Sequence, residues 1–523
     1  MCGITVFFGD RTVANLDMYF KGGSKRGPEQ YTYECNEDVH LGFHRLAING
    51  LNEESSQPLH YKNYVMVCNG EIYNYHELVE RYQFKMETQS DCEVILKLYD
   101  LMQENCVHEL DGEFAFVIHD LSTDHIFAAR DPYGVRPLYM NEIAQSFCLS
   151  SDLYPMRFLP MNVTHFPPGH YAVFTKNLWG YSKVLTSYST VNENTLTSEL
   201  HIYNTLCNAV YKRVMNTERP VACLLSGGLD SSIVAALAAK YCQESGKILE
   251  TYSIGLPGSE DLKYSAIVAE HIGSVHTQII CSEKEFIDSI PRVIKDIESY
   301  DTTTVRASVG NWNVGKYIKE HSHAKVVLNG DGADELMGGY LYFSACPDHQ
   351  EFDKECRRLL NDIHRYDVLR SDKSIASHGL EPRTPYLDKA FVNAYLSLPS
   401  ETRFHCPQGK IEKHILRGIL QKYNPELLPM NILYRRKEAF SDGVSSFHKS
   451  WYEIIQENVP PFDPTLVYSH NSPTTGEQQY YRSIFNRHYK GCEHLIPYFW
   501  MPRYIVATDA SARTLKQYTL NEV

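Results

Sequence analysis

The sequence lacks the features of a membrane protein or a nucleic-acid-binding protein. No uninterrupted apolar run approaches the ~20 residues that cross a bilayer, and residues 1–4 carry neither the basic nor the apolar stretch of a secretory signal. Positive charge is not in excess, since 50 Lys and Arg face 64 Asp and Glu for a formal net charge of −14. A broad phosphate-binding surface is therefore not expected. We expect a cytoplasmic protein that binds neither membranes nor nucleic acids.

Paired cysteine and histidine motifs are also absent. The 14 cysteines are scattered and include no CxxC pair, which predicts reduced thiols. Cys68 and Cys223 lie in apolar, strand-like runs and are expected in the core. His321 and His323 have no cysteine or carboxylate cluster beside them in the sequence, so we predict no metal site there.

The chain exceeds the roughly 250 to 300 residues that one hydrophobic core accommodates, so at least two domains are expected. Up to residue 185, short apolar segments separated by turns predict antiparallel strands. From Leu196 on, helix-like and strand-like segments alternate, which predicts a parallel sheet covered by helices on both faces. The polar run 189–199 is the expected boundary, with Asn194 or Thr195 capping the next helix.

Cys2 is a candidate nucleophile. Removal of the initiator methionine would leave it with its own α-amine beside the thiol, and that amine can act as general base. Position alone is weak evidence, because a cysteine at position 2 is usually incidental. Further support comes from four segments that follow in order, HRLAING (44–50), CNGEIYN (68–74), SDCEVI (90–95) and ARDPYGVRPLY (129–139). With them the chain resembles the class II glutamine amidotransferases, which are N-terminal nucleophile glutaminases.

This resemblance implies an α+β domain over residues 2–188, an antiparallel β sandwich with helices that hydrolyses glutamine. Arg45 then corresponds to the arginine that holds the α-carboxylate of glutamine. Asn69 and Gly70 correspond to the oxyanion hole, and Asp91 to the group that takes the α-ammonium. Without the resemblance, Arg45 reads as a surface ion pair and Asn69-Gly70 as a simple turn. The other implied glutamine-binding residues are Leu46, Ala47, Ile48, Asn49 and Glu71.

A second site is expected at SGGLDSS (226–232), between a strand-like and a helix-like segment. Glycines allow close backbone approach to an anion, serines add donors, and the helix N-terminus adds partial positive charge. The segment is neither a Walker A loop nor a dinucleotide fingerprint. It resembles the SGGxDS loop of ATP pyrophosphatases. The implied ATP-binding residues are Leu225, Ser226, Gly227, Gly228, Asp230, Ser231, Ile254, Asn329 and Gly330.

Later segments extend the resemblance to the asparagine synthetase family, over residues 196–518. They are SIGLPGSEDL (253–262), YDTTTVRAS (300–308), LNGDGADELMGGY (328–340), EPRTPYLD (381–388), KIEKHILR (410–417), RRKEAFSDG (435–443) and the tail 498–518. The first three follow strand-like runs, and open α/β sheets bind ligands at the carboxyl ends of their strands. The implied adenylation residues are Asp331 and Lys437, with Asp261, Thr302, Thr303 and Arg306 in the aspartate site and Asp230 and Asp334 as Mg²⁺ ligands.

Two residues depart from the family string SGEGSDE. Asn329 stands where serine is usual and Asp331 where glutamate is usual. Asn329 keeps donor and acceptor capacity, and Asp331 keeps the carboxylate on a side chain one methylene shorter.

The resemblance as a whole implies synthesis of asparagine from aspartate, ATP and glutamine, with Mg²⁺ and a β-aspartyl-AMP intermediate. A homodimer is a further expectation from the family. A related amidotransferase that acts on another carboxylate is the alternative enzyme. From a different class, the chain could be an inactive scaffold or binding partner that retains the fold, although the intact Cys2, SGGLDSS and Lys437 speak against this.

Overall fold

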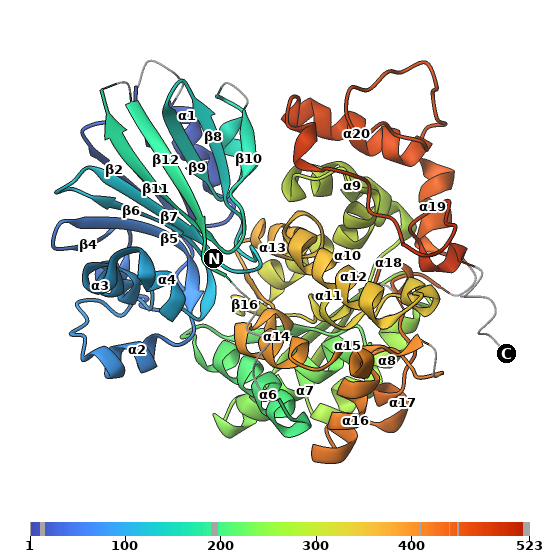
Figure 1. The fold of residues 1–523 in the computed structure, drawn as a ribbon. Helices are drawn as coiled ribbons and strands as arrows, with labels where there is room; N and C mark the ends of the chain where they lie inside the picture. The colour runs from blue at the N-terminus through green and yellow to red at the C-terminus, as the bar shows by residue number, and fades with distance from the viewer. Residues whose placement is uncertain are drawn as a thin grey trace.

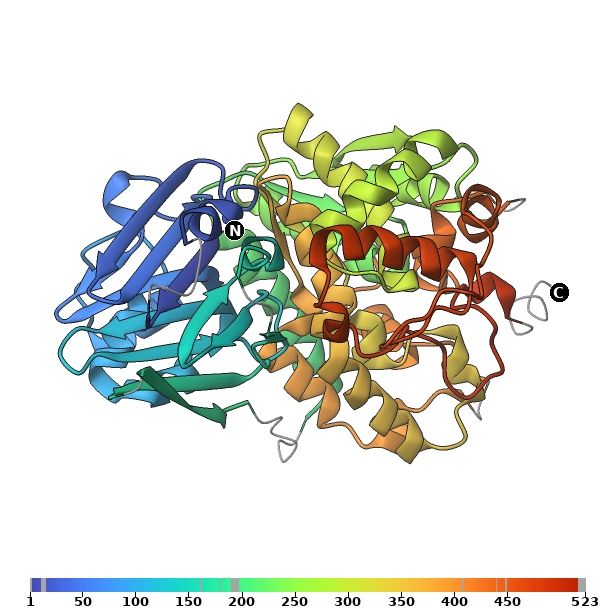
Figure 2. The ribbon, with the colours of Figure 1, turned by 90° about the horizontal axis from the view of Figure 1, so that it is seen from above.

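The computed structural model describes residues 2–10, 16–159, 162–178, 180–189, 197–406, 409–438, 440–446 and 449–515. An N-terminal part, through strand β12, is mainly β-sheet, and a C-terminal part, from helix α6 on, is mainly helical; the two lie side by side (Figures 1 and 2). The expected caps Asn194 and Thr195 lie outside the described residues. Within them, Ser198 caps α6 (Glu199–Met215) by accepting a hydrogen bond from the His201 N–H at 3.2 Å.

The N-terminal part contains two six-stranded antiparallel sheets, ordered β10-β8-β9-β1-β3-β2 and β12-β11-β7-β6-β5-β4. The strands of the first sheet are β1 (Gly3–Phe8), β2 (Gln30–Asn36), β3 (Val39–Arg45), β8 (Tyr139–Ile143), β9 (Ser146–Ser150) and β10 (Val163–His165). Those of the second are β4 (Leu59–Tyr61), β5 (Tyr64–Ile72), β6 (Gly112–Asp120), β7 (His125–Arg130), β11 (His170–Asn177) and β12 (Gly180–Ser187). The helices are α1 (Leu16–Phe20), α2 (Tyr75–Tyr82), α3 (Glu93–Met102), α4 (Cys106–Glu109) and α5 (Leu153–Met156).

The two sheets form a sandwich with a shared core. In β1, Val6 and Phe8 pack with Val65 and Val117 of the opposite sheet, whereas Phe7 points to the other face and joins a second core. Because successive side chains of a strand alternate between faces, β1 is buried on both sides. The predicted β sandwich is confirmed.

The C-terminal part is built on a five-stranded parallel sheet, ordered β15-β14-β13-β16-β17. Its strands are β13 (Val221–Leu224), β14 (Glu250–Gly255), β15 (Val275–Ile280), β16 (Val326–Leu328) and β17 (Glu381–Arg383). The helices after α6 are α7 (Leu229–Glu244), α8 (Glu260–Ile272), α9 (Glu283–Ile297), α10 (Thr302–His321), α11 (Ala333–Met337), α12 (His349–Asp362), α13 (Asp367–Ala376), α14 (Lys389–Leu396), α15 (Ser400–Arg403), α16 (His414–Tyr423), α17 (Met430–Leu433), α18 (Phe440–Gly443), α19 (Trp451–Asn458) and α20 (Gly476–Tyr489). The predicted parallel sheet is confirmed as well.

Strand β17 is the edge of this sheet that meets the N-terminal part. Pro382 lies in its middle, which an edge strand tolerates because the missing N–H is not needed for a further ladder. The Pro382 carbonyl accepts a hydrogen bond from Nη1 of Arg136, in the N-terminal part, at 3.0 Å. The neighbours of Pro382 in the strand, Glu381 and Arg383, are fully buried.

All 14 cysteines are free thiols, and Cys68 and Cys223 are fully buried, as predicted. Among the described residues, none of the helices combines the length and apolar character that a bilayer crossing demands.

Candidate active sites

Cys2 lies just before the start of β1, an interior strand of the first sheet, and is half-buried. Its backbone N–H donates to Asn69 Oδ1 at 3.2 Å, and its Sγ lies 3.6 Å from the Leu46 carbonyl oxygen. Nε of Arg26, which is buried, donates to the Cys2 carbonyl at 3.2 Å. Arg26, Leu46 and Asn69, which belong to three separate segments, therefore hold Cys2 in position.

Asn69 and Gly70 lie within strand β5, so the simple-turn interpretation is wrong. The Asn69 amide is held at both ends, since its Nδ2 also donates to Ser151 Oγ at 3.4 Å. A Cβ at Gly70 would meet the Glu113 carbonyl oxygen at 2.7 Å, so only glycine fits at this point of close strand contact. The geometry places an oriented amide beside Cys2, which is what an oxyanion hole requires.

Arg45 is buried and has no carboxylate partner among the described residues. Its Nη2 donates to the carbonyls of Gly50 and Asn52 at 2.6 and 2.7 Å, and its Nη1 to Gln30 Oε1 at 3.3 Å. The surface ion pair considered above is thus absent. A buried guanidinium with only neutral partners keeps an uncompensated charge, which a bound carboxylate would balance.

Two buried carboxylates, Asp91 and Glu71, lie near the segment that contains Arg45. Asp91 Oδ2 accepts from the Ile72 N–H at 2.7 Å, and burial raises the pKa of Asp91 to about 6. Glu71 Oε2 accepts from Asn49 Nδ2 at 2.7 Å, and burial together with Asp91 raises the pKa of Glu71 well above its usual range. A cationic group such as a ligand ammonium would relieve the repulsion between these two acids.

Burial also raises the pKa of the Cys2 thiol to about 11, and the charges of Glu381 and Glu71 act in the same direction. The thiol is therefore protonated at neutral pH in this arrangement. A thiolate is the reactive form, so catalysis at Cys2 requires an adjacent base.

The SGGLDSS loop connects β13 to α7, as predicted. Gly227 has φ +72°, and a Cβ there would lie 2.4 Å from the backbone of Tyr264, so the loop closely contacts α8 at this point. The Ser226 and Ser231 hydroxyls lie 3.0 Å apart, and Ser231 Oγ accepts from the Ser226 N–H at 3.2 Å. The loop is thus held in a tight curve above the start of α7.

A cavity lies at the carboxyl ends of the parallel strands, where the sequence predicts the nucleotide. Many predicted residues line it, namely Leu225, Ser226, Gly228, Asp230, Ser231, Ile254, Asp261, Thr303, Asn329, Gly330, Asp331, Asp334 and Lys437. Sequence reasoning missed Glu335, Lys413, Arg370 and Arg435, which also line it. Gly227 faces α8 instead.

Two acidic and two basic side chains meet in this cavity. Lys413 Nζ contacts Asp230 and Asp334 at 2.5 Å each, while Lys437 Nζ lies 2.5 Å from Asp334 and 3.8 Å from Asp230. Burial opposes ionisation of Asp334, but the two lysines outweigh it and hold the pKa of Asp334 well below its usual range. Asp230 Oδ1 is buried and has no hydrogen-bond partner among the residues that the structure describes. This oxygen is available to a cation or donor.

The two departures from the family string have structural explanations. Asn329 uses both ends of its amide, because Oδ1 accepts from the Asp331 N–H at 3.1 Å and Nδ2 donates to Ser371 Oγ at 2.6 Å. Asp331 Oδ1 accepts from Arg370 Nη2 at 2.9 Å, while its buried Oδ2 has no hydrogen-bond partner in the described part of the chain. The shorter acid is therefore anchored on one oxygen and leaves the other available.

Asp261 lines the same cavity as Asn329 and Asp331. Burial raises the pKa of Asp261 to about 6, although Arg435 Nη2 donates to its Oδ1 at 3.0 Å. Nη1 of Arg435 also donates to the Ser226 carbonyl at 3.2 Å. The arginine thus connects Asp261 to the SGGLDSS loop.

Arg306 and Thr302 do not line the cavity. The Arg306 guanidinium donates to Glu477 at 2.6 and 2.8 Å and to Asp509 at 2.7 and 2.8 Å, and all of it is buried. Thr302 is buried in the first turn of α10, next to its cap Asp301. The structure therefore gives Arg306 a role in packing α10 against α20 and the C-terminal segment, rather than the expected place in an aspartate site.

Replacement of Arg306 by methionine tests this assignment. Removing one member of a buried ion pair leaves Glu477 and Asp509 uncompensated, so we expect the free energy of unfolding to fall by about 3–5 kcal/mol. At temperatures where the variant is folded, KM for aspartate should not change. Thermal unfolding and steady-state kinetics measure the two effects, and a raised KM without loss of stability would restore Arg306 to the site.

Buried contacts join the two sites. Arg383 Nη2 of β17 lies 3.3 Å from Glu71, next to the Asn69-Gly70 pair. One apolar cluster contains Leu46 and Ile48 near Cys2 as well as Leu225 and Leu229 near the nucleotide cavity. The interface between the two parts is therefore packed from one site to the other.

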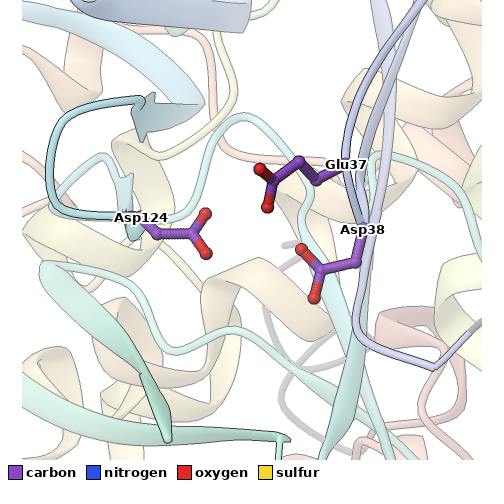
Figure 3. A group of neighbouring side chains, drawn as sticks. All are labelled: Glu37, Asp38 and Asp124. Atoms are coloured by element: carbon purple, nitrogen blue, oxygen red, sulfur yellow. The ribbon is translucent and has the colours of Figure 1, made fainter.

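One acidic group elsewhere could be mistaken for a metal site. The carboxylates of Glu37, Asp38 and Asp124 offer oxygens within 4.8 Å of one another (Figure 3). Lys176 Nζ lies 3.7, 3.0 and 2.7 Å from them, respectively. The Lys176 ammonium contacts all three carboxylates and offsets one of their three negative charges.

Comparisons with known proteins agree with both sites. A glutamine amidotransferase domain model matches residues 1–177, and an asparagine synthase model matches residues 201–351 and 344–495. The chain is 39% identical over 561 residues to asparagine synthetase [glutamine-hydrolyzing] of Gallus gallus and 38% identical over 566 residues to that of Homo sapiens. Each alignment covers 99% of this chain and 99% of the relative. The chain therefore belongs to the family of glutamine-hydrolysing asparagine synthetases.

Proposed function

We propose that the enzyme makes asparagine through β-aspartyl-AMP and releases glutamate, AMP and pyrophosphate. We further propose that residues 2–188 form the glutaminase domain and residues 196–518 the synthetase domain. The observation that supports this best is the pairing of two different sites in one chain. One holds a thiol beside an oriented amide, and the other is a strand-end cavity with the SGGLDSS loop and two lysines.

In the glutaminase site, Cys2 Sγ attacks the side-chain amide carbon of glutamine. Methionine removal exposes the α-amine that accepts the thiol proton, and Asn69 Oδ1 is placed to hold this amine. Asn69 Nδ2 and the Gly70 N–H stabilise the oxyanion, and collapse of the intermediate expels ammonia and leaves a thioester. Water then releases glutamate. Arg45 holds the substrate α-carboxylate and Asp91 its α-ammonium.

In the synthetase site, the β-carboxylate of aspartate attacks the α-phosphorus of ATP and pyrophosphate leaves. Bringing a carboxylate to a triphosphate gathers negative charge, which Lys437 offsets. Ammonia then attacks the activated acyl carbon, and AMP departs. Leu225, Ser226, Gly228 and Ser231 line the cavity where the loop would cradle the phosphates, and Ile254 is placed for the adenine.

The residues present fit a magnesium ion. Mg²⁺ prefers carboxylate and phosphate oxygens, and Asp230 offers an unpartnered buried oxygen beside Asp334. Asp230 and Asp334 would hold the ion, which would supply charge neutralisation at the ATP phosphates.

Ammonia must pass between the sites without entering bulk water, where it would become ammonium and lose its nucleophilicity. The apolar cluster from Leu46 and Ile48 to Leu225 and Leu229 supports a path within the protein.

Product analysis tests the whole scheme: glutamine, aspartate and Mg-ATP should give asparagine, AMP and pyrophosphate in equal amounts. Product from another carboxylic acid, with none from aspartate, would identify a different amidotransferase.

Asp331→Asn should slow adenylate formation by about 100-fold, because the amide keeps the size of the side chain but loses the charge that pairs with Arg370. Glutaminase turnover should stay unchanged. Pyrophosphate release measures the first effect and glutamate release the second. Asp331→Glu, which restores the usual family residue, is the control and should retain synthesis. Full-rate pyrophosphate release by the asparagine variant would show that Asp331 is only structural.

A further inference from the structure

A second cavity, of about 520 Å³, lies between the two parts and shares no lining residue with the nucleotide cavity. Ser24, Lys25 and Pro28 form its N-terminal wall, and helices α9 and α10 with the end of α13 form the other wall. Its size is in the range of small-molecule sites, roughly 300–1,000 Å³. Neither the glutaminase nor the synthetase chemistry uses it.

The cavity is strongly cationic. Lys25, Arg292, Lys295 and Lys319 line it, and the one acidic residue on its wall is Asp296. That carboxylate is already engaged, because it pairs with Lys25 and accepts from the indole N–H of Trp312 at 3.0 Å.

Three of these cations have no carboxylate within ion-pair distance in the part of the chain that the structure describes. They are Arg292, Lys295 and Lys319; the Lys295 ammonium lies instead 4.8 Å from the ring centroid of Tyr154. The whole chain carries a net charge of −14, so a cavity with surplus positive charge runs against the overall composition. Arg292 and Lys319 are exposed, and a bound anion would supply these cations with a charged partner.

His378 gives an independent sign of a ligand. The residue is 7% exposed and lines the cavity, and its Nε2 has no hydrogen-bond partner in the described structure. An unsatisfied buried polar atom is costly. Burial, together with Lys319 and Lys25, lowers the pKa of His378 to about 3, so the ring is neutral at physiological pH.

We propose that this cavity binds the phosphate group of a small phosphorylated molecule. A phosphate accepts hydrogen bonds from Arg292 and Lys319 and, in its monoprotonated form, donates its O–H to Nε2 of His378. When the ring proton is on Nδ1, Nε2 is an acceptor, and sulfate, which carries no proton at neutral pH, cannot make the last contact. The cavity is larger than one phosphate, so the remaining volume suits the organic portion of an ester.

The position of the cavity connects it to the nucleophile. Lys25 precedes Arg26, whose Nε holds the Cys2 carbonyl at 3.2 Å and whose guanidinium pairs with Asp372 of α13 at 2.7 Å. A bound anion would join the Lys25 segment to α9 and α10 beside this contact.

Binding is tested on the full-length enzyme with the synthetase site saturated by a non-hydrolysable ATP analogue and Mg²⁺. Calorimetric titrations with inorganic phosphate, glycerol 3-phosphate and sodium sulfate should show saturable binding of the first two and weaker binding of sulfate. Arg292→Gln/Lys319→Gln should weaken phosphate binding by at least about tenfold. Lys240→Gln/Lys284→Gln removes the same charge from exposed helix positions and should bind phosphate normally.

Two further variants examine the individual contacts. Trp312→Phe should lose any phosphate-dependent change in tryptophan fluorescence yet keep the heat of binding, which would place the ligand next to this indole. His378→Phe should bind phosphate and sulfate equally.

No saturable phosphate binding, or equal binding by the Arg292→Gln/Lys319→Gln protein, would overturn the site. Equal affinity of the unmodified enzyme for sulfate and phosphate would overturn the phosphate assignment, and tighter binding of glycerol 3-phosphate than of phosphate would identify an ester as the ligand.

Discussion

Cys2→Ala is expected to abolish asparagine synthesis from glutamine, by at least about 10⁴-fold, while synthesis from ammonium salts continues. The substitution removes the nucleophile only. Cys2 is half-buried at the end of the first sheet, so loss of its side chain should have little effect on folding, and the SGGLDSS cavity lies in the other part of the chain. Dissolved ammonia can then enter the intact synthetase site. The measurement is asparagine formed per AMP with each nitrogen source.

Cys35→Ala is the matched control, because Cys35 is an exposed thiol on β2 of the same sheet. It should behave as the unmodified enzyme with both nitrogen sources. Glutamine-dependent synthesis by Cys2→Ala would show that another group is the nucleophile. Loss of the ammonia-dependent reaction would show instead that the two sites are not independent.

Lys437→Ala is expected to reduce pyrophosphate release by roughly 10²- to 10³-fold or more, which is the usual effect of removing a charge aimed at a developing anion. The ammonium of Lys437 contacts Asp334 inside the cavity in which we propose that the triphosphate and aspartate meet. Glutamate release from glutamine should persist. Parallel assays of pyrophosphate and glutamate separate the two chemistries.

Lys410→Ala serves as the control, since Lys410 is an exposed lysine in the segment that leads to α16. Its removal should leave both products unchanged. If Lys437→Ala still made asparagine at near-normal rates, the charge-offsetting role would pass to another cation of the cavity. Lys413 is the first candidate, because its ammonium contacts both Asp230 and Asp334.

The architecture could be predicted from the sequence wherever strands or helices were long enough to show a period. Strand β3 is fully buried, yet its apolar Val39, Leu41 and Phe43 alternate with other residues, so its period is present in the sequence. Strands β4, β10 and β17 have three residues each, too few for any period. Their places depend on pairing with distant segments.

The candidate sites could be predicted only where a residue belongs to a recognisable string. Lys413 looks like a solvated lysine in the sequence, and its contacts with two aspartates appear only in three dimensions. For Arg306, the position in YDTTTVRAS suggested a ligand, whereas in the structure its guanidinium pairs with Glu477, which is 171 residues away. Contacts at such separations leave no local pattern.

The buried edge strand β17 has an evolutionary consequence. Glu381 and Arg383 are fully buried, and Arg383 pairs with Glu71 across the boundary between the two parts. A recombination event that imported a foreign glutaminase half could remove Glu71 from this contact, and Arg383 would then keep only its partners within the C-terminal part, Glu381 and the carbonyls of Arg213 and Asn216. The two parts of the chain should therefore evolve together, with compensating substitutions on both sides of their interface, even though each performs its own reaction.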